Sequence, residues 1–252
     1  MFIDISGEGA PLVLIHGWGL NGAVWNGVLP ELTKHFKVYN IDLPGFGHSR
    51  DHWPDSVRLI DWAQMIRAKI PDQSIIIGWS LGGLFAQQLA IQFPEKVKHL
   101  VLIGSTPKFS QSDDWPGMKP EVLSSFHQAL KRDPEKTIER FLAIQAMGSD
   151  SVKEDVRHLR LWLQQKPVAQ VQALNIGLDI LALGDLRKQW HLIKCPVTGF
   201  FGRLDSLVPV PAIDSMLQLL PSLQTHIFKH SSHAPFISEP TLFLDQLYKS
   251  LH

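Results

Sequence analysis

Short runs of apolar residues, many of them β-branched, alternate with helical patterns along most of this chain. The runs span residues 11–17, 36–45, 74–78, 97–105, 195–202 and 224–230. Helical patterns such as residues 56–70 and 83–92 lie between them. Near-continuous Val, Ile, Leu and Phe in strands that helices separate is typical of a parallel sheet covered on both faces. The sequence therefore predicts an α/β fold with a mostly parallel central sheet and helices on both faces.

One long segment interrupts this alternation. Between about residues 108 and 190 no strand pattern appears, and several helical patterns follow one another, with Asp133 and Ser149–Ser151 as favourable helix caps. We expect residues 1–107 and 191–252 to form the core of the fold. Residues 108–190 are expected to form a helical cap over the C-terminal edge of the sheet.

The charge of the chain is balanced, with 24 Lys and Arg residues against 24 Asp and Glu residues. No net field therefore favours nucleic acid or an anionic membrane, and a charged partner has to be met by a local patch. The one cysteine, Cys195, excludes an internal disulfide and is expected to be a buried structural thiol. Because the N-terminus also lacks a basic region followed by an apolar one, we expect a cytoplasmic protein.

An uncharged stretch from Ser74 to Pro94 has the length of a membrane span, but glutamines and glycines interrupt it. It is better explained as a strand, a turn and a helix. Residues 78–82 match G-x-S-x-G, in which a nucleophilic serine, here Ser80, lies on a strained strand-to-helix turn. The pattern alone is weak, but the preceding Ile-rich strand and the following helix supply the context that it requires.

A nucleophilic serine needs a histidine base and an orienting carboxylate, in the chain order Ser, Asp, His. His233 lies in a loop after the last apolar strand, and His230, which adjoins the end of that strand, is a nearby alternative. Asp205 follows the penultimate strand, where its carboxylate can reach the outer ring nitrogen of the base. Three other acidic candidates fall in helical patterns and are expected to be solvated or capping residues: Asp179, Asp185 and Asp214.

Ester hydrolysis by a serine also needs backbone N–H groups that bind the oxygen of the tetrahedral intermediate. Residues 16–19, His-Gly-Trp-Gly, follow an apolar strand and can turn back over the nucleophile. We expect the N–H groups of Trp18 and Leu81 to be the donors. The alternative is a glycine-rich turn that only connects two elements.

These motifs make the chain resemble the α/β-hydrolase superfamily over nearly its whole length, with HGWG after the third strand and DLPGFGHS after the fourth. It is further similar to the carboxylesterases of biotin synthesis that act on pimeloyl-[acyl-carrier protein] methyl ester. The segments that carry this similarity are LIHGWGLN, DLPGFGHSR, GWSLGGLFA, DDWPGMKPEVL, ERFLAIQAMG and SHAPFISEP. Several lie in the helical insertion, where relatives of different function rarely agree.

The resemblance implies a serine esterase that removes the methyl group from a pimeloyl chain carried on acyl carrier protein and releases methanol. Ser80, Asp205 and His233 would form the catalytic triad, which favours His233 over His230. No metal and no organic cofactor would be needed, and small free esters would also be substrates. The residues implied to line the acyl pocket are Phe141, Leu142, Ala143, Ile144 and Gln145, with Trp79 as one wall.

Acyl carrier protein is acidic, so the cap of this neutral chain has to supply the attraction. Residues 131–160 hold seven basic and six acidic residues, a net charge of only +1, which on its own favours ordinary solvated helix faces. The resemblance instead implies a carrier-binding role for basic residues that share helix faces. These residues are Lys136, Arg140, Lys153 and Arg157, with Arg160 beside them.

Two other functions remain open from the sequence. A general short-chain carboxylesterase or thioesterase would use the same triad on small free esters. A catalytically silent binding protein would keep the fold without the reaction, since a fold does not fix a function.

Overall fold

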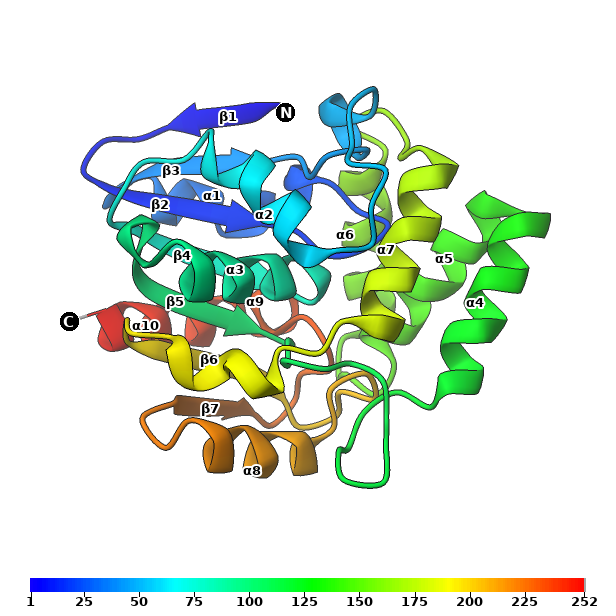
Figure 1. Ribbon diagram of the computed structural model, residues 1–252. Coiled ribbons are helices and arrows are strands. Elements are labelled where there is room, and N and C mark those ends of the chain that lie inside the picture. The colour runs from blue at the N-terminus through cyan, green and yellow to red at the C-terminus, as the bar shows by residue number, and fades with distance from the viewer. Residues whose placement is uncertain (252) are drawn as a thin grey trace.

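Seven strands form one central sheet in the computed structural model, which describes residues 1–251 (Figure 1). Their order across the sheet is β1-β3-β2-β4-β5-β6-β7, and every neighbouring pair is parallel except β1 with β3. The strands are β1 (Ile3–Ser6), β2 (Ala10–Ile15), β3 (Phe36–Ile41), β4 (Ser74–Trp79), β5 (Val97–Ile103), β6 (Val197–Gly202) and β7 (Gln224–Phe228). The predicted α/β fold with a mostly parallel sheet is confirmed.

The edge strand β1 is the strand that the sequence pattern does not predict. Its four residues are partly exposed, so they lack the solid apolar run of the inner strands. The resemblance put HGWG after a third strand and DLPGFGHS after a fourth, whereas these segments follow β2 and β3 in the structure. The resemblance therefore implied one strand too many before HGWG. The nine residues before β2 have room for only one short strand, because glycines in the left-handed region of φ, Gly7 and Gly9, turn the chain there.

Helices cover both faces of the sheet, as Figure 1 shows. The helices α2 (Leu59–Arg67), α3 (Leu81–Gln92) and α8 (Val210–Leu219) lie in front of the sheet in this view. The helices α1 (Leu29–Leu32), α9 (Pro235–Ser238) and α10 (Pro240–Leu251) lie behind it. Both β4 and β6 are buried over their whole length as a result, which explains their unbroken apolar sequences.

Four helices connect β5 to β6 and lie beyond the C-terminal ends of the strands (Figure 1). They are α4 (Pro120–Arg132), α5 (Pro134–Ala146), α6 (Val152–Leu163) and α7 (Val171–Leu183). Asp133 caps α5 as predicted, since its side chain accepts a hydrogen bond from the N–H of Lys136. Ser151 precedes α6, but its hydroxyl donates to the buried Asp155 instead of capping the helix. We propose that residues 108–190 act as a cap on a core formed by the rest of the chain.

A buried ion pair joins the cap to the core. Lys166, in the connection between α6 and α7, donates to Asp42, which follows β3, over 2.9 Å. Asp42 is fully buried and also accepts from the backbone N–H groups of Gly22 and His48. Since each oxygen of the carboxylate has a donor, the charge of Asp42 is compensated within the protein.

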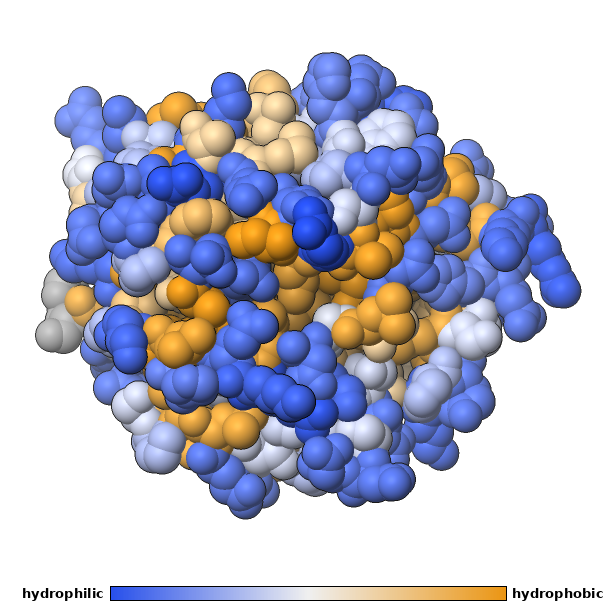
Figure 2. Space-filling view, in the orientation of Figure 1, coloured by the Kyte–Doolittle hydropathy of each residue, from blue (hydrophilic) through white to orange (hydrophobic). Residues whose placement is uncertain are grey.

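Hydrophilic side chains dominate the face of the molecule seen in Figure 2, with apolar side chains gathered near its centre. A groove of about 400 Å³ runs between α2 and the segment after α7, and its apolar lining includes Val57, Leu59 and Leu183. None of the predicted catalytic residues lines this groove. No helix among residues 1–251 has the length and apolar character needed to cross a membrane.

Candidate active site

Ser80 lies on the turn between β4 and α3, at the C-terminal edge of the sheet. Its backbone adopts φ 55° and ψ −121°, in a region that non-glycine residues rarely occupy. The N–H of Ser80 donates to the carbonyl of Ile103, and the carbonyl of Ser80 accepts from the N–H of Gly83, both over 2.9 Å. The predicted strand, tight turn and helix are therefore present, with the serine at the strained position.

The two glycines of the G-x-S-x-G pattern are required by close backbone contacts. A Cβ atom on Gly78 would lie 2.6 Å from the Cα of Gly83. A Cβ atom on Gly82 would lie 2.5 Å from the carbonyl oxygens of Ile15 and His16. No larger side chain fits at either position unless the turn opens, so the pattern reflects the packing of the turn against β2.

Asp205 and His233 form a fully buried pair. Nδ1 of His233 lies 2.7 Å from Oδ2 of Asp205. The other oxygen of Asp205 accepts from the N–H groups of Leu207 and Val208, at 2.8 and 3.1 Å. The carboxylate is an acceptor, so Nδ1 carries the proton and Nε2 keeps its lone pair. Nε2 is buried and has no hydrogen-bond partner within residues 1–251, including Ser80 Oγ.

The loop that carries His233 is held from both sides. Its N–H donates to the carbonyl of Gln145 on α5 over 3.0 Å, and its carbonyl accepts from Nε1 of Trp79 over 2.9 Å. A Cβ atom on Gly104, just after β5, would lie 2.9 Å from Nδ1 of the imidazole. The ring therefore packs on the end of β5, next to the strand that leads to Ser80.

The rival candidates lie elsewhere. His230 is exposed and pairs with Asp150 over 2.7 Å. The three other acidic candidates lie on helices or pair with surface groups: Asp179 on α7 with His127, Asp185 with Arg187, and Asp214 on the exposed side of α8.

Cys195 precedes β6 at the opposite edge of the sheet and is only half-buried, less than expected. Burial raises the pKa of its thiol to about 11, so it stays protonated at neutral pH.

The loop after β2 passes directly beside Ser80. A Cβ atom on Gly17 would lie 3.2 Å from the Cβ of Ser80. Trp18 and Leu81 are fully buried, and their backbone N–H groups have no acceptor within residues 1–251. Buried N–H groups without a partner are rare in proteins, so two of them beside one serine are consistent with a site that binds an oxygen.

His16 is a polar residue of this loop whose contacts the sequence did not reveal. Its Nε2 accepts from the N–H of Leu43 over 2.9 Å, and its Nδ1 lies 2.8 Å from the carbonyl of Gly17. Burial lowers its pKa to about 4, against the smaller opposing effect of Asp42. The imidazole is therefore neutral at neutral pH, with the proton on Nδ1.

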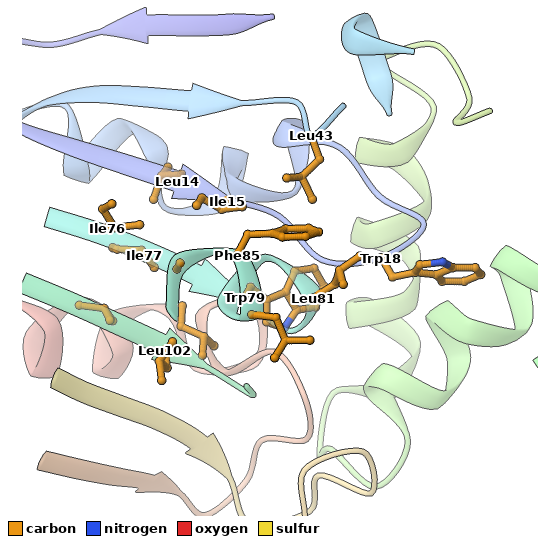
Figure 3. Packing of buried hydrophobic residues seen from close by; sticks show 14 of the residues in the cluster. Leu14, Ile15, Trp18, Leu43, Ile76, Ile77, Trp79, Leu81, Phe85 and Leu102 are labelled. Atoms are coloured by element: carbon orange, nitrogen blue, oxygen red, sulfur yellow. The ribbon is translucent and has the colours of Figure 1, made fainter. Parts of the chain in front are cut away.

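Aromatic side chains connect the loop to the cap. Nε1 of Trp18 donates to the carbonyl of Leu174 on α7 over 2.8 Å. Its ring packs edge to face on Phe141, with centroids 4.9 Å apart, and on Phe126 at 6.4 Å. Figure 3 shows Trp18 extending from the loop toward the cap helices, beyond Trp79 at the end of β4 and Leu81 at the start of α3. The helices α5 and α7 thus pack on the loop beside Ser80 in this conformation.

The residues expected to line the acyl pocket do not share one face of α5. Phe141, Leu142 and Gln145 are buried, whereas Ile144 is half-buried and Ala143 is exposed. Successive residues of a helix point about 100° apart, so five in a row cannot face the same cavity. Oε1 of Gln145 is buried without a hydrogen-bond partner within residues 1–251.

The basic residues of the cap are exposed on α5 and α6, as expected, but most have an acidic neighbour. The pairs are Lys136 with Asp133, Arg157 with Glu154, and Arg160 with Glu139. Lys153 and Arg140 form no ion pair within residues 1–251, and the guanidinium of Arg140 lies 5.4 Å from the ring centre of Phe126. These two cations are the least compensated of the set.

The comparisons with known proteins agree with this geometry. A family model of the α/β hydrolase fold matches residues 10–240. The chain is 46% identical over 243 residues to the pimeloyl-[acyl-carrier protein] methyl ester esterase of Aeromonas hydrophila, with 96% of each chain covered. It is 45% identical over 246 residues to the esterase of the same name from Pseudoalteromonas atlantica, with 97% of this chain and 95% of the relative covered. The chain belongs to this esterase family of α/β hydrolases.

Members of the esterase family are carboxylic ester hydrolases, and so is this protein. The resemblance stated from the sequence motifs is confirmed. Solved structures add evidence for the fold alone. An esterase from Exiguobacterium antarcticum matches with a TM-score of 0.89 at 21% identity, covering 98% of this chain and 94% of that one. A bromoperoxidase from Bacillus anthracis matches with a TM-score of 0.87 at 19% identity, and the match covers 99% of this chain and 94% of the bromoperoxidase.

Proposed function

We propose that this protein is a serine carboxylesterase that hydrolyses the methyl ester of pimeloyl-[acyl-carrier protein] to methanol and the free acid. The observation that supports the chemistry is the buried Asp205–His233 pair at the same sheet edge as the strained Ser80. The observation that supports the substrate is the 46% identity to an esterase of that name over 96% of both chains.

The reaction follows from the roles of five groups. Oγ of Ser80 attacks the ester carbonyl while Nε2 of His233 takes its proton, and the N–H groups of Trp18 and Leu81 bind the oxyanion. The methoxide leaves with the proton from His233, which gives methanol and an acyl-enzyme. Water then attacks the acyl-enzyme with the same base, and Ser80 is regenerated. Asp205 holds the proton on Nδ1 throughout.

We place the acyl chain between the end of β4 and α5. Trp79, Phe141 and Leu142 supply apolar surface there, and Gln145 supplies a buried acceptor. Ala143 is left out because it is exposed. Since Ser80 is only 2% exposed and His233 is fully buried, the cap has to move for a substrate on a carrier protein to enter.

For the carrier protein we propose a docking surface on the exposed faces of α5 and α6, made by Lys136, Arg140, Lys153 and Arg157. Opposite charge between an acidic carrier and this surface would speed association and orient the partner. Because Lys136 and Arg157 already have acidic neighbours, Arg140 and Lys153 are expected to contribute most. The single cysteine supports a cytoplasmic setting.

Methanol release from carrier-linked and free methyl pimelate tests both the proposed ester hydrolysis and the proposed carrier-docking surface. We expect the carrier-linked ester to be preferred, and the preference to shrink as salt is added. Arg140→Glu with Lys153→Glu should lower kcat/KM at least about tenfold for the carrier-linked ester and leave the free ester unchanged. The matched control is Lys69→Glu with Lys98→Glu, an equal charge change on exposed residues at the opposite edge of the sheet. Equal turnover of both esters at all salt concentrations would instead favour a general carboxylesterase.

A further inference from the structure

Two peptide groups carry the N–H donors of the proposed oxyanion site, one between Gly17 and Trp18 and one between Ser80 and Leu81. Both peptides are trans. In a trans peptide the carbonyl and the N–H point in opposite directions within one plane, so holding the oxygen sets the direction of the N–H. In this protein a buried side chain holds each of the two oxygens.

Ser105 holds the oxygen of the second peptide. It lies in the loop after β5, is fully buried, and donates its hydroxyl to the carbonyl of Ser80 over 2.9 Å. The N–H of Gly83 donates to the same oxygen. The carbonyl of a residue with a strained backbone is thus held by two donors on one side of the peptide, while the N–H of Leu81 on the other side has no acceptor among residues 1–251.

The Ser105 hydroxyl is itself oriented by neighbours. Nε2 of Gln87 on α3 lies 3.4 Å from it, and Oε1 of Gln87 accepts from Nε1 of Trp190 over 2.7 Å. All three side chains are fully buried. A Cβ atom on Gly83 would collide with this hydroxyl, which explains the second glycine after Leu81, outside the G-x-S-x-G pattern.

His16 holds the oxygen of the first peptide in the same way. Its Nε2 accepts from Leu43, so the proton is on Nδ1, which donates to the carbonyl of Gly17 over 2.8 Å. The N–H of Trp18 lies on the opposite side of that peptide plane. Two side chains from different parts of the chain therefore make equivalent contacts with the two donor peptides.

We propose that Ser105 and His16 are positioning residues that aim the N–H groups of Leu81 and Trp18 at the oxyanion by holding the opposite carbonyls of their peptides. This inference rests on the proposed function, because an oxyanion has to form at Ser80. Neither side chain touches the substrate. Their effect falls on the transition state, in which the oxygen carries charge, and not on binding of the neutral ester.

The test compares Ser105→Ala with Ser74→Ala. Ser74 is the matched control, since it is fully buried and donates to the carbonyl of Pro71 over 2.9 Å at the other end of β4. For Ser105→Ala we expect kcat on free methyl pimelate to fall about 10- to 100-fold, with KM within about twofold of the wild-type value. The affinity for a trifluoromethyl ketone analogue, which adds to Ser80 and places an oxyanion in the site, should fall by the same factor.

The pH midpoint of kcat/KM should stay unchanged, because the Asp205–His233 pair is untouched. Ser74→Ala should lower Tm by a similar amount and change neither kcat nor the inhibitor affinity. Ser105→Cys, which keeps a weaker donor, should give an intermediate kcat. It tests the positioning role of Ser105 if Ser105→Ala does not fold. His16→Leu should show the same loss in kcat and inhibitor affinity.

Ser80→Ala distinguishes a failure of this inference from a failure of the proposed function. If Ser80→Ala is inactive while the Ser105 and His16 variants lower Tm like Ser74→Ala and keep kcat and inhibitor affinity within about twofold, this inference is overturned and the proposed function stands. If Ser80→Ala keeps its turnover, the proposed function fails and this inference fails with it.

Discussion

The sheet edge around Ser80 and the outer faces of the cap helices hold their charged groups in opposite ways. At the sheet edge both side chains of the Asp205–His233 pair are fully buried. On the cap, the side chains of Lys136 and Asp133 lie 3.2 Å apart but are 88% and 40% exposed. A buried pair keeps one geometry, whereas an exposed pair is screened by water and can exchange partners at little cost. This contrast fits the two proposed roles, fixed chemistry at the sheet edge and reversible docking on the cap surface.

The largest effect is expected from Asp205→Asn, which alters the buried Asp205–His233 pair. The amide cannot hold the histidine in the same tautomer, so kcat should fall about 10⁴-fold. The control is Asp185→Asn, which changes a partly exposed carboxylate that pairs with Arg187. Methanol release from methyl pimelate measures both variants. A similar loss in both, or a loss below about tenfold for Asp205→Asn, would mean that the wrong carboxylate was assigned.

The ion pair between cap and core should give the next largest effect. Lys166→Met leaves the fully buried Asp42 without its cation, so the free energy of unfolding should fall by about 3 to 5 kcal/mol. Lys34→Met removes one partner of an exposed pair with Glu31 and should leave stability unchanged within error. Urea denaturation measures the free energy of unfolding of both variants. Equal losses would contradict the expected difference between buried and exposed ion pairs.

The buried imidazole of His16 predicts a pH dependence of stability. Its pKa is lowered from 6.5 to about 4 in the folded state, so the unfolded chain binds the proton more readily. The contribution is fully present above pH 6.5 and is lost as the pH falls toward 4, by about 3 kcal/mol in total. Burial also lowers the pKa of His99 and His226, so the difference between wild type and His16→Asn isolates the effect. Parallel stability curves for the two proteins would contradict it.

The smallest effect is expected on the cap. Lys136→Ala removes the exposed partner of Asp133 and leaves the backbone N–H that Asp133 caps. The urea midpoint should not change measurably, while kcat/KM for the carrier-linked ester should fall a few-fold. A clear loss of stability without any effect on the carrier-linked ester would assign Lys136 a structural role instead.

The sequence predicted the features that follow from the order of strands and helices along the chain. A parallel sheet brings the ends of β4, β6 and β7 to one edge, so residues 80, 205 and 233 could be expected there together, while the resemblance to the family favoured residue 233 over residue 230. It missed β1, whose half-exposed residues carry no apolar run. It also missed Ser105 and His16, because the Ser105 hydroxyl donates to a carbonyl 25 residues away and the imidazole of His16 accepts from Leu43, 27 residues away, and neither contact leaves a local pattern. The available signals are a serine two residues after β5 and a histidine that directly follows β2.

Labelling with a fluorophosphonate reports directly whether Ser80 is an activated nucleophile. Peptide mass spectrometry of the labelled protein should show one adduct, on Ser80, formed rapidly in the wild type and far more slowly in His233→Ala. Asp185→Asn should label at the wild-type rate. An adduct on another residue, or no adduct in a preparation that still releases methanol, would contradict the assignment of Ser80 and with it the account of the site.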